Sequence, residues 1–132
     1  FWDVLTKNLH TKYGVMPVHT LPEIELLHSR FPQNIQLYQA VKDGEVLGGV
    51  VLYVSHQVVH AQYSSATSVG KKLGVIDLLY DHIFSDYRNY PYFDFGRSTE
   101  HPDGSGLNEK LVFQKEGFGG RGLCYDIYEY DL

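Results

Sequence analysis

Apolar residues recur at intervals of three or four along two stretches at the start of the chain, which is the spacing of one helix face. The first stretch covers residues 1–13, and Gly14 follows it as a residue suited to ending a helix. The second begins at Thr20, which forms a capping-box pattern with Glu23, and ends before Pro32. Two helices are therefore predicted before any strand.

Alternation with a period of two follows, which is typical of strands. Strands are predicted over residues 35–41 and 46–55, joined by a hairpin turn at residues 42–45, and over residues 58–66. The glycine pair Gly48-Gly49 in the second strand indicates a bulge, or a close approach by another backbone or a ligand. We favour the bulge.

The strongest helical pattern comes next. Six apolar residues step by four and three positions: Val69, Leu73, Ile76, Tyr80, Ile83 and Tyr87. They predict one amphipathic helix. The elements expected after it are a strand at 92–95, a polar loop at 97–104, a helix from an N-cap at Ser105 to about Glu116, and a last strand at 123–130.

This order predicts a mixed sheet of the α/β (α+β) class with helices on both faces. Its first three strands are antiparallel neighbours, and a right-handed parallel βαβ crossover joins the strand at 58–66 to the strand at 92–95. Ligand sites in such sheets lie beyond the carboxyl ends of the parallel strands. We therefore expect the segments 66–72 and 96–104 to line a site.

The 132 residues fit a single domain, 1–132. The formal charge of −5, from 16 acidic and 11 basic residues, gives no broad positive field, which argues against generic nucleic-acid binding. No apolar run is long enough to cross a membrane and no secretory leader is visible, so we expect a cytoplasmic protein. The single cysteine, Cys124, lies in a strand-like run and is predicted to be buried.

The element order resembles the core of the Gcn5-related N-acetyltransferase (GNAT) fold. Two motifs, Asp94-Phe95-Gly96-Arg97-Ser98 and Phe113-x-Lys115-x-x-Phe118-Gly119, look like the C-terminal signature of FemAB-like acyltransferases, which consist of two GNAT-like halves. The resemblance spans the whole chain. It implies the C-terminal half of a longer protein that begins before Phe1, with an upstream GNAT-like half as its partner and a cell-wall or sugar precursor amine as its substrate.

The resemblance leaves the acyl donor open between acyl-CoA, such as acetyl-CoA, and an aminoacyl-tRNA. GNAT enzymes that use acyl-CoA carry Gln/Arg-x-x-Gly-x-Gly/Ala at the start of the central helix, whereas the segment Lys71-Lys72-Leu73-Gly74-Val75-Ile76 keeps only one of these glycines. Three functions follow: FemAB-like transfer of an acyl or aminoacyl group to an amine, CoA-dependent N-acetyl transfer, or a docking half without chemistry of its own.

Candidate donor-binding residues lie at the start of the predicted central helix. Free amides and the helix dipole favour an anion there, which suggests a role for four neighbouring residues: Ser68, Gly70, Lys71 and Lys72. The alternative is a normally capped helix with two solvated lysines.

Acyl transfer to an amine requires a base and a donor for the developing oxyanion. Glu100, His101 and Asp103 are candidates for the base or for positioning the amine, with Glu100 chosen as the catalytic residue, and the resemblance makes Lys115 the strongest single residue. Six residues are predicted to contact substrate: Gln62, Tyr63, Arg97, Ser98, Thr99 and Asn108. Asp94 is interpreted as structural. His56 and His60 lie about 13 Å apart if extended, so no metal site is expected.

Overall fold

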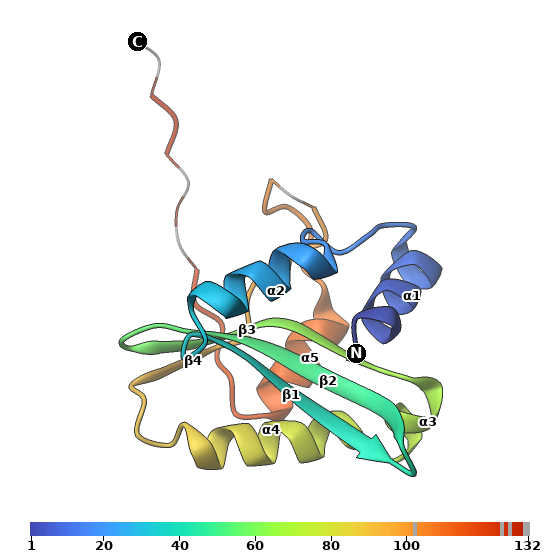
Figure 1. Ribbon diagram of the computed structural model, residues 1–132. Helices are drawn as coiled ribbons and strands as arrows, with labels where there is room; N and C mark the ends of the chain where they lie inside the picture. The colour runs from blue at the N-terminus through green and yellow to red at the C-terminus, as the bar shows by residue number, and fades with distance from the viewer. Residues whose placement is uncertain (102, 125, 127, 131–132) are drawn as a thin grey trace. The chain divides into compact units, whose positions relative to one another are not determined.

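The computed structural model describes residues 1–101, 103–124, 126 and 128–130 of the chain (Figure 1). Its contacts form two compact units, Phe1–Gly96 and Arg97–Leu132, which are described separately below. The first unit contains α1 (Trp2–Tyr13), α2 (Leu21–Arg30), β1 (Ile35–Lys42), β2 (Glu45–Val54), β3 (Val58–Ala66), α3 (Ser68–Lys72), α4 (Val75–Asp86) and β4 (Tyr92–Asp94). The second contains α5 (Glu109–Gly117).

The two first helices end and begin as their local sequence predicts. Gly14 adopts a left-handed conformation with φ of 67° and donates its N–H to the carbonyl of His10, which closes α1. At α2, the N–H and hydroxyl of Thr20 both donate to the Glu23 carboxylate, at 2.7 and 2.9 Å. Both predicted helices are confirmed.

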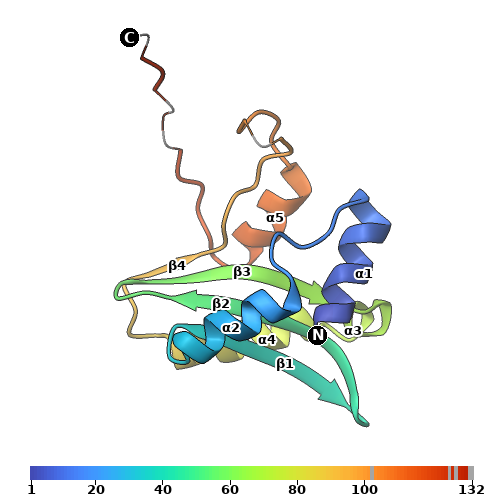
Figure 2. The same ribbon diagram turned by 45° about the horizontal axis from the view of Figure 1, so that its top comes forward.

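The sheet has the order β1-β2-β3-β4, with antiparallel pairs along β1-β2-β3 and a parallel pair between β3 and β4. Helices α1 and α2 lie on one face and α4 on the other, and Figure 2 brings the first two forward over the sheet. The predicted mixed α/β sheet, with its parallel crossover and helices on both faces, is confirmed.

The predicted bulge lies in β2 next to the glycine pair. Ala40 pairs with Gly48 and Val41 with Val46, which leaves Leu47 as the extra residue. The Leu47 carbonyl then accepts the N–H of Thr67 at 2.8 Å, at the point where β3 passes into α3. The bulge therefore fixes where the crossover begins.

The single long helix predicted from the apolar pattern is wrong. Gly74, in the left-handed conformation with φ of 69°, separates α3 from α4. Val69 and Leu73 of the predicted apolar face are 57% and 55% exposed. The helix that packs on the sheet is α4, whose buried residues are Val75, Leu79, Tyr80 and Ile83.

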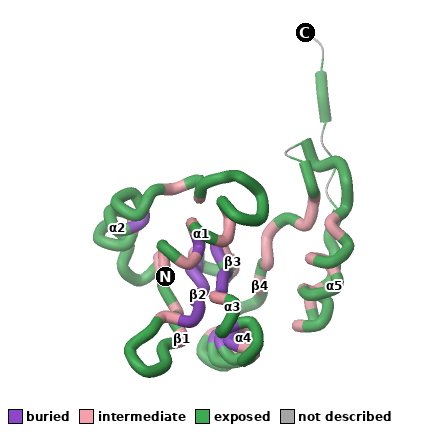
Figure 3. Tube along the Cα trace, turned by 90° about the vertical axis from the view of Figure 1, so that its right-hand side faces the viewer, coloured by how far each residue is buried: buried purple, intermediate pink, exposed green. Residues whose placement is uncertain are grey.

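The buried residues concentrate in β2, β3 and α4 (Figure 3). On the face toward α1 and α2, a cluster forms from Leu5, Ile24, Val51 and Tyr63. On the other face, the rings of Tyr80 and Phe84 of α4 contact Phe93 and Phe95, with centroids 5.0–6.1 Å apart. Two apolar layers thus enclose the central strands.

No helix in the described part of the chain is long and apolar enough to span a bilayer.

The second unit departs from the sequence prediction at both ends. Ser105 does not cap the helix, because its N–H and hydroxyl donate to Asp103, and α5 instead begins after Asn108, whose side chain accepts the N–H of Leu111. No strand forms at the described positions between 123 and 130; residues 125 and 127 lie outside the described part. Cys124 is exposed rather than buried, since no sheet forms there to cover it.

Gly70 provides a test of how the crossover packs. A Cβ at this position would collide with the backbone carbonyl of Leu47, which cannot move without disturbing the β2 bulge. Gly70→Ala should lower the free energy of unfolding by about 1–3 kcal/mol, as measured by urea denaturation. Gly117→Ala, where a Cβ meets nothing within 4 Å, is the control and should be neutral or stabilising; equal effects would contradict this packing role.

The capping box at Thr20 predicts a pH-dependent stability. The pKa of Glu23 is lowered because the N–H and hydroxyl of Thr20 donate to its carboxylate. A lowered pKa in the folded state stabilises the fold at neutral pH, and this stabilisation is lost as pH falls through that pKa. Glu23→Gln should therefore lower the melting temperature at pH 7 but not in strong acid, whereas the same helix's Glu25→Gln should show no such difference; a pH-independent loss would refute the prediction.

Candidate active site

The two parallel strands stay together over only three positions. Val58 pairs with Tyr92, Val59 with Phe93 and His60 with Asp94, after which β4 ends. β3 continues to Ala66 without β4 beside it. Among the described residues, the backbone of β3 beyond His60 thus has no strand partner on that side, at the carboxyl ends of the parallel pair.

A histidine and a carboxylate meet at the last of these positions. His60 Nδ1 lies 2.7 Å from Asp94 Oδ2, and the second oxygen, Oδ1, accepts the N–H of Gly96 at 2.7 Å. The side chains are 29% and 54% exposed, so both remain accessible. Asp94 does close the loop, as its structural interpretation supposed, and it also orients the imidazole.

The other imidazole nitrogen is also engaged. His60 Nε2 lies 3.1 Å from Oε1 of Gln62, an arrangement that suits a protonated ring donating from both nitrogens. When the ring is neutral and Nδ1 donates to Asp94, a half-turn of the Gln62 amide presents its NH₂ group to the Nε2 lone pair. Asp94 and Gln62 can therefore hydrogen-bond both ring nitrogens whether the imidazole is neutral or protonated.

A bulge in β3 places Gln62 beside His60. Tyr63 pairs with Val51 and Ala61 with Leu52, so Gln62 is an extra residue without a partner in β2. As a result Gln62 and Tyr63 both face α1 and α2: Gln62 contacts His60, and the Tyr63 ring packs edge-on against Trp2 at 5.3 Å. Without the extra residue, Tyr63 would turn toward α4.

The Tyr63 hydroxyl holds the connection between α1 and α2. It lies 2.8 Å from His19 Nδ1 and accepts the backbone N–H of the same residue at 3.3 Å. Tyr63 of β3 therefore anchors the loop between α1 and α2.

The predicted donor-binding residues lie around the short helix α3. Thr67 Oγ1 accepts the N–H of Gly70 at 3.0 Å, so this amide is already used by the cap, and Gly70 packs against Leu47. Ser68, Lys71 and Lys72 are exposed. The two lysines thus supply positive charge in the segment directly after β3.

The second unit gathers most of the other predicted residues. Lys115 Nζ donates to the carbonyl of Arg97 at 2.7 Å and to Ser98 Oγ at 2.9 Å, and the N–H of Asn108 donates to the carbonyl of Ser98. Thr99 bridges Leu107 across the same loop. Half-buried Lys115 therefore holds the start of the loop against α5.

The predicted base Glu100 lies further along this loop and is exposed. Its N–H donates to the carbonyl of Gly106, while the pKa of Asp103 nearby is lowered because Ser105 donates to its carboxylate. In the described part of the chain, no group of three or more histidine, cysteine, aspartate or glutamate side chains could hold a metal ion.

A family model described as acetyltransferase (GNAT) domain matches residues 2–102. The chain belongs to the GNAT acetyltransferase family. The match covers the first unit and the start of the second, and so includes both β3 and β4. It supports the GNAT part of the sequence resemblance, whereas the FemAB-like part and the status of C-terminal half stay predictions.

Solved structures share this GNAT fold at low identity. A possible acetyltransferase from Clostridium difficile 630 has a TM-score of 0.69 at 10% identity, covering 98% of this chain and 88% of that chain. The aminoglycoside acetyltransferase meta-AAC0020 from an uncultured soil metagenomic sample, in complex with sisomicin, has a TM-score of 0.64 at 16% identity, covering 98% and 87%. AAC(6')-Iy in complex with the bisubstrate analog CoA-S-monomethyl-acetylneamine has a TM-score of 0.63 at 13% identity, covering 88% and 83%. No curated protein matches the chain.

The His60–Asp94 pair of this GNAT domain escaped sequence analysis. The two residues are 34 positions apart, and only the parallel register brings them opposite each other. From the sequence alone, His60 suggests only a possible metal ligand. The available signal was the predicted crossover itself, which places polar residues of the two strands in register.

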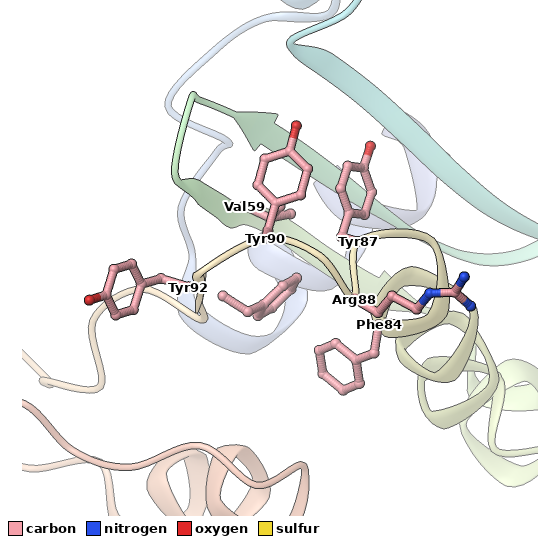
Figure 4. Close-up of a pocket in the computed structure, with 7 residues that line it drawn as sticks. Val59, Phe84, Tyr87, Arg88, Tyr90 and Tyr92 are labelled. Carbon is pink, nitrogen blue, oxygen red and sulfur yellow. The ribbon is translucent and has the colours of Figure 1, made fainter.

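A small aromatic pocket lies apart from this pair. It has a volume of about 210 Å³ and is lined by Val59, Phe84, Tyr87, Arg88, Tyr90, Tyr92 and Phe93. Figure 4 shows the side chains of Arg88 and Tyr92 pointing in opposite directions, away from a common centre. The lining therefore does not converge polar groups on one ligand.

Lys115 remains a predicted site residue that mutation can test. Lys115→Ala removes the two hydrogen bonds to Arg97 and Ser98, which should lower acyl transfer by about tenfold or more through misplacement of the loop. Circular dichroism should show the fold retained. Lys110→Ala, an exposed lysine of the same helix, is the matched control, and unchanged transfer by Lys115→Ala would remove the residue from the site.

Proposed function

We propose that this chain transfers an acyl group from an acyl-CoA thioester to a primary amine, with His60 as the general base. The observation that supports the proposal is the His60–Asp94 pair at the position where β3 and β4 part. Imidazole is the side chain most often used to move protons at neutral pH, and a carboxylate partner fixes its orientation. Membership of the GNAT acetyltransferase family makes acyl transfer the reaction to consider.

The chain's residues suit the removal of a proton from an attacking amine. With Nδ1 of His60 donating to Asp94, the Nε2 lone pair, which lies beside the Gln62 side chain, accepts the proton when the amine takes the place of the Gln62 amide. The resulting imidazolium donates to Asp94 from one nitrogen and to Gln62 from the other, as the observed distances allow. The charge formed on the ring is thereby stabilised from both sides.

The residues also fit a CoA thioester. The edge of β3 beyond His60 offers main-chain groups to an extended amide-containing chain, in the manner of strand addition. Lys71 and Lys72 provide charge for phosphates, whereas Asp77 in the first turn of α4 disfavours anions there. When bound, acyl-CoA would supply the activated carbonyl: the amine nitrogen would form the C–N bond, the C–S bond would break, and CoA would leave as the thiolate.

The finer assignments from sequence stay predictions. These are the FemAB-like transfer to a cell-wall or sugar precursor, an aminoacyl-tRNA as alternative donor, and dependence on an upstream half. Glu100 as base belongs with them. A CoA donor is favoured here because the structure of AAC(6')-Iy, which shares the fold, is a complex with a CoA-containing bisubstrate analog.

His60 provides the direct test of the proposed function. His60→Gln should lower kcat/KM for acetyl transfer from acetyl-CoA to a primary amine by about 10²–10⁴-fold, because the general base is lost. Asp94→Asn should give a smaller loss, since an amide still accepts the Gly96 N–H but no longer stabilises an imidazolium. Free thiol release measures both.

The matched control is His56→Gln, which changes an exposed histidine four positions before His60 and should retain full activity. The pH profile separates a base from a structural residue: His60→Gln should remove the acidic limb of kcat/KM. If the variant keeps both the rate and that limb, His60 is not the base.

A further inference from the structure

A cavity adjoins the imidazole of His60. Its volume is about 560 Å³, within the range of small-molecule sites. The lining residues come from the connection between α2 and β1, the start of β1, the end of β2 with the residue after it, and the start of β3: Phe31, Asn34, Ile35, Tyr53, Val54, Ser55, Val58 and His60. All of them belong to the first unit, and the proposed base is one of them.

The side chains of Asn34 and Ser55, which line this cavity, already hydrogen-bond within the fold. The Asn34 amide Nδ2 donates to the carbonyl of Val54 at 2.6 Å. The Ser55 hydroxyl donates to the carbonyl of Val58 and accepts the N–H of the same residue, at 3.0 and 3.1 Å. A ligand would therefore meet hydrocarbon and aromatic surface on most sides, and the imidazole on one.

The cavity wall also lacks negative charge. None of its lining residues is acidic, although the chain as a whole carries a formal charge of −5. Asp94, the carboxylate paired with His60, is not among the lining residues and hydrogen-bonds His60 and Gly96. The hydroxyl of Tyr53 is buried without a partner among the described residues, and burial raises its pKa, so this wall stays neutral at physiological pH.

We propose that this cavity binds the acceptor and selects a primary amine carried on an apolar or aromatic body. A polycationic amino sugar would bring several charges against a wall with no carboxylate to pair them, which costs desolvation without compensation. An arylalkylamine places its ring against Phe31, Ile35 and Val58 and its amine toward His60. The substrate class thus differs from the aminoglycosides of the meta-AAC0020 neighbour. This inference rests on the proposed function for the role of His60.

Binding can be measured without turnover. Titration of the full chain with 2-phenylethylamine, followed by amide NMR shifts, should perturb Tyr53, Ser55 and Val58. Ethylamine, which carries the same amine without the ring, should bind about tenfold or more weakly, because burying the ring supplies most of the affinity. Neamine, a polycationic amino sugar, should also bind more weakly than 2-phenylethylamine.

A substitution in the wall tests the same point through kinetics. Val58→Thr keeps the shape but replaces a methyl group with a hydroxyl, and should lower kcat/KM for 2-phenylethylamine by about tenfold while leaving ethylamine almost unchanged. Val41→Thr is the matched control. Val41 is a strand valine that is 58% exposed, and it lies at the end of β1 away from Ile35 and the cavity. It should match the unaltered protein with both amines.

The outcomes separate this inference from the proposed function. If His60→Gln abolishes turnover and still binds 2-phenylethylamine, both stand. If His60→Gln remains active and 2-phenylethylamine still perturbs the cavity, the base assignment fails and the cavity assignment holds. Shifts that miss Tyr53, Ser55 and Val58, or tighter binding of neamine or ethylamine, would overturn the cavity assignment.

Discussion

The candidate site depends on one extra residue in β3. An antiparallel strand shows alternate side chains to its two faces, so inserting Gln62 keeps two consecutive residues on the face of α1 and α2. Gln62 then reaches the imidazole of His60, while Tyr63 fills the core and anchors His19. Removing the insertion would send Tyr63 to the other face and separate these contacts. The bulge therefore supports both packing and chemistry.

A second bulge, in β2, fixes the point at which the crossover from β3 to α3 begins. The carbonyl of Leu47 accepts the N–H of Thr67, the N-cap of α3. Gly70 has no side chain and can therefore pack directly against this carbonyl. The left-handed Gly74 then redirects the chain so that α4 can lie along the sheet. Together these features return the chain to the edge of β3, where three parallel pairs suffice to set Asp94 opposite His60.

Local signals in the sequence were sufficient for most of the first unit. Gly14 and the capping box at Thr20 define helix ends through contacts within a few residues, and the strand at 58–66 was predicted with its observed bounds. Apolar periodicity failed at Gly74, because a period of 3.6 continues through a residue whose backbone leaves the helix. Apolar periodicity depends only on which side chains are apolar, so it gives no information about the positive φ of a single residue.

The second unit and the site show the limits of the same reasoning. Ser105 has the side chain of an N-cap, but its hydroxyl donates to the Asp103 carboxylate instead of accepting a helix N–H. The motif resemblance did group Arg97, Ser98 and Lys115, which share hydrogen bonds. The His60–Asp94 pair was missed because it depends on the register of two strands separated by two helices, which the predicted crossover indicates only in outline.

Asp94 ends β4 with a carboxylate whose two oxygens perform different tasks. One closes the bend at Gly96 and the other holds the ring of His60. The shape of the chain at the strand end and the orientation of the imidazole are consequently one property rather than two. A side chain without these two oxygens would lose the Gly96 hydrogen bond and the contact with Nδ1 together and leave the ring held from the Gln62 side, so the backbone at this corner cannot be redesigned independently of the imidazole.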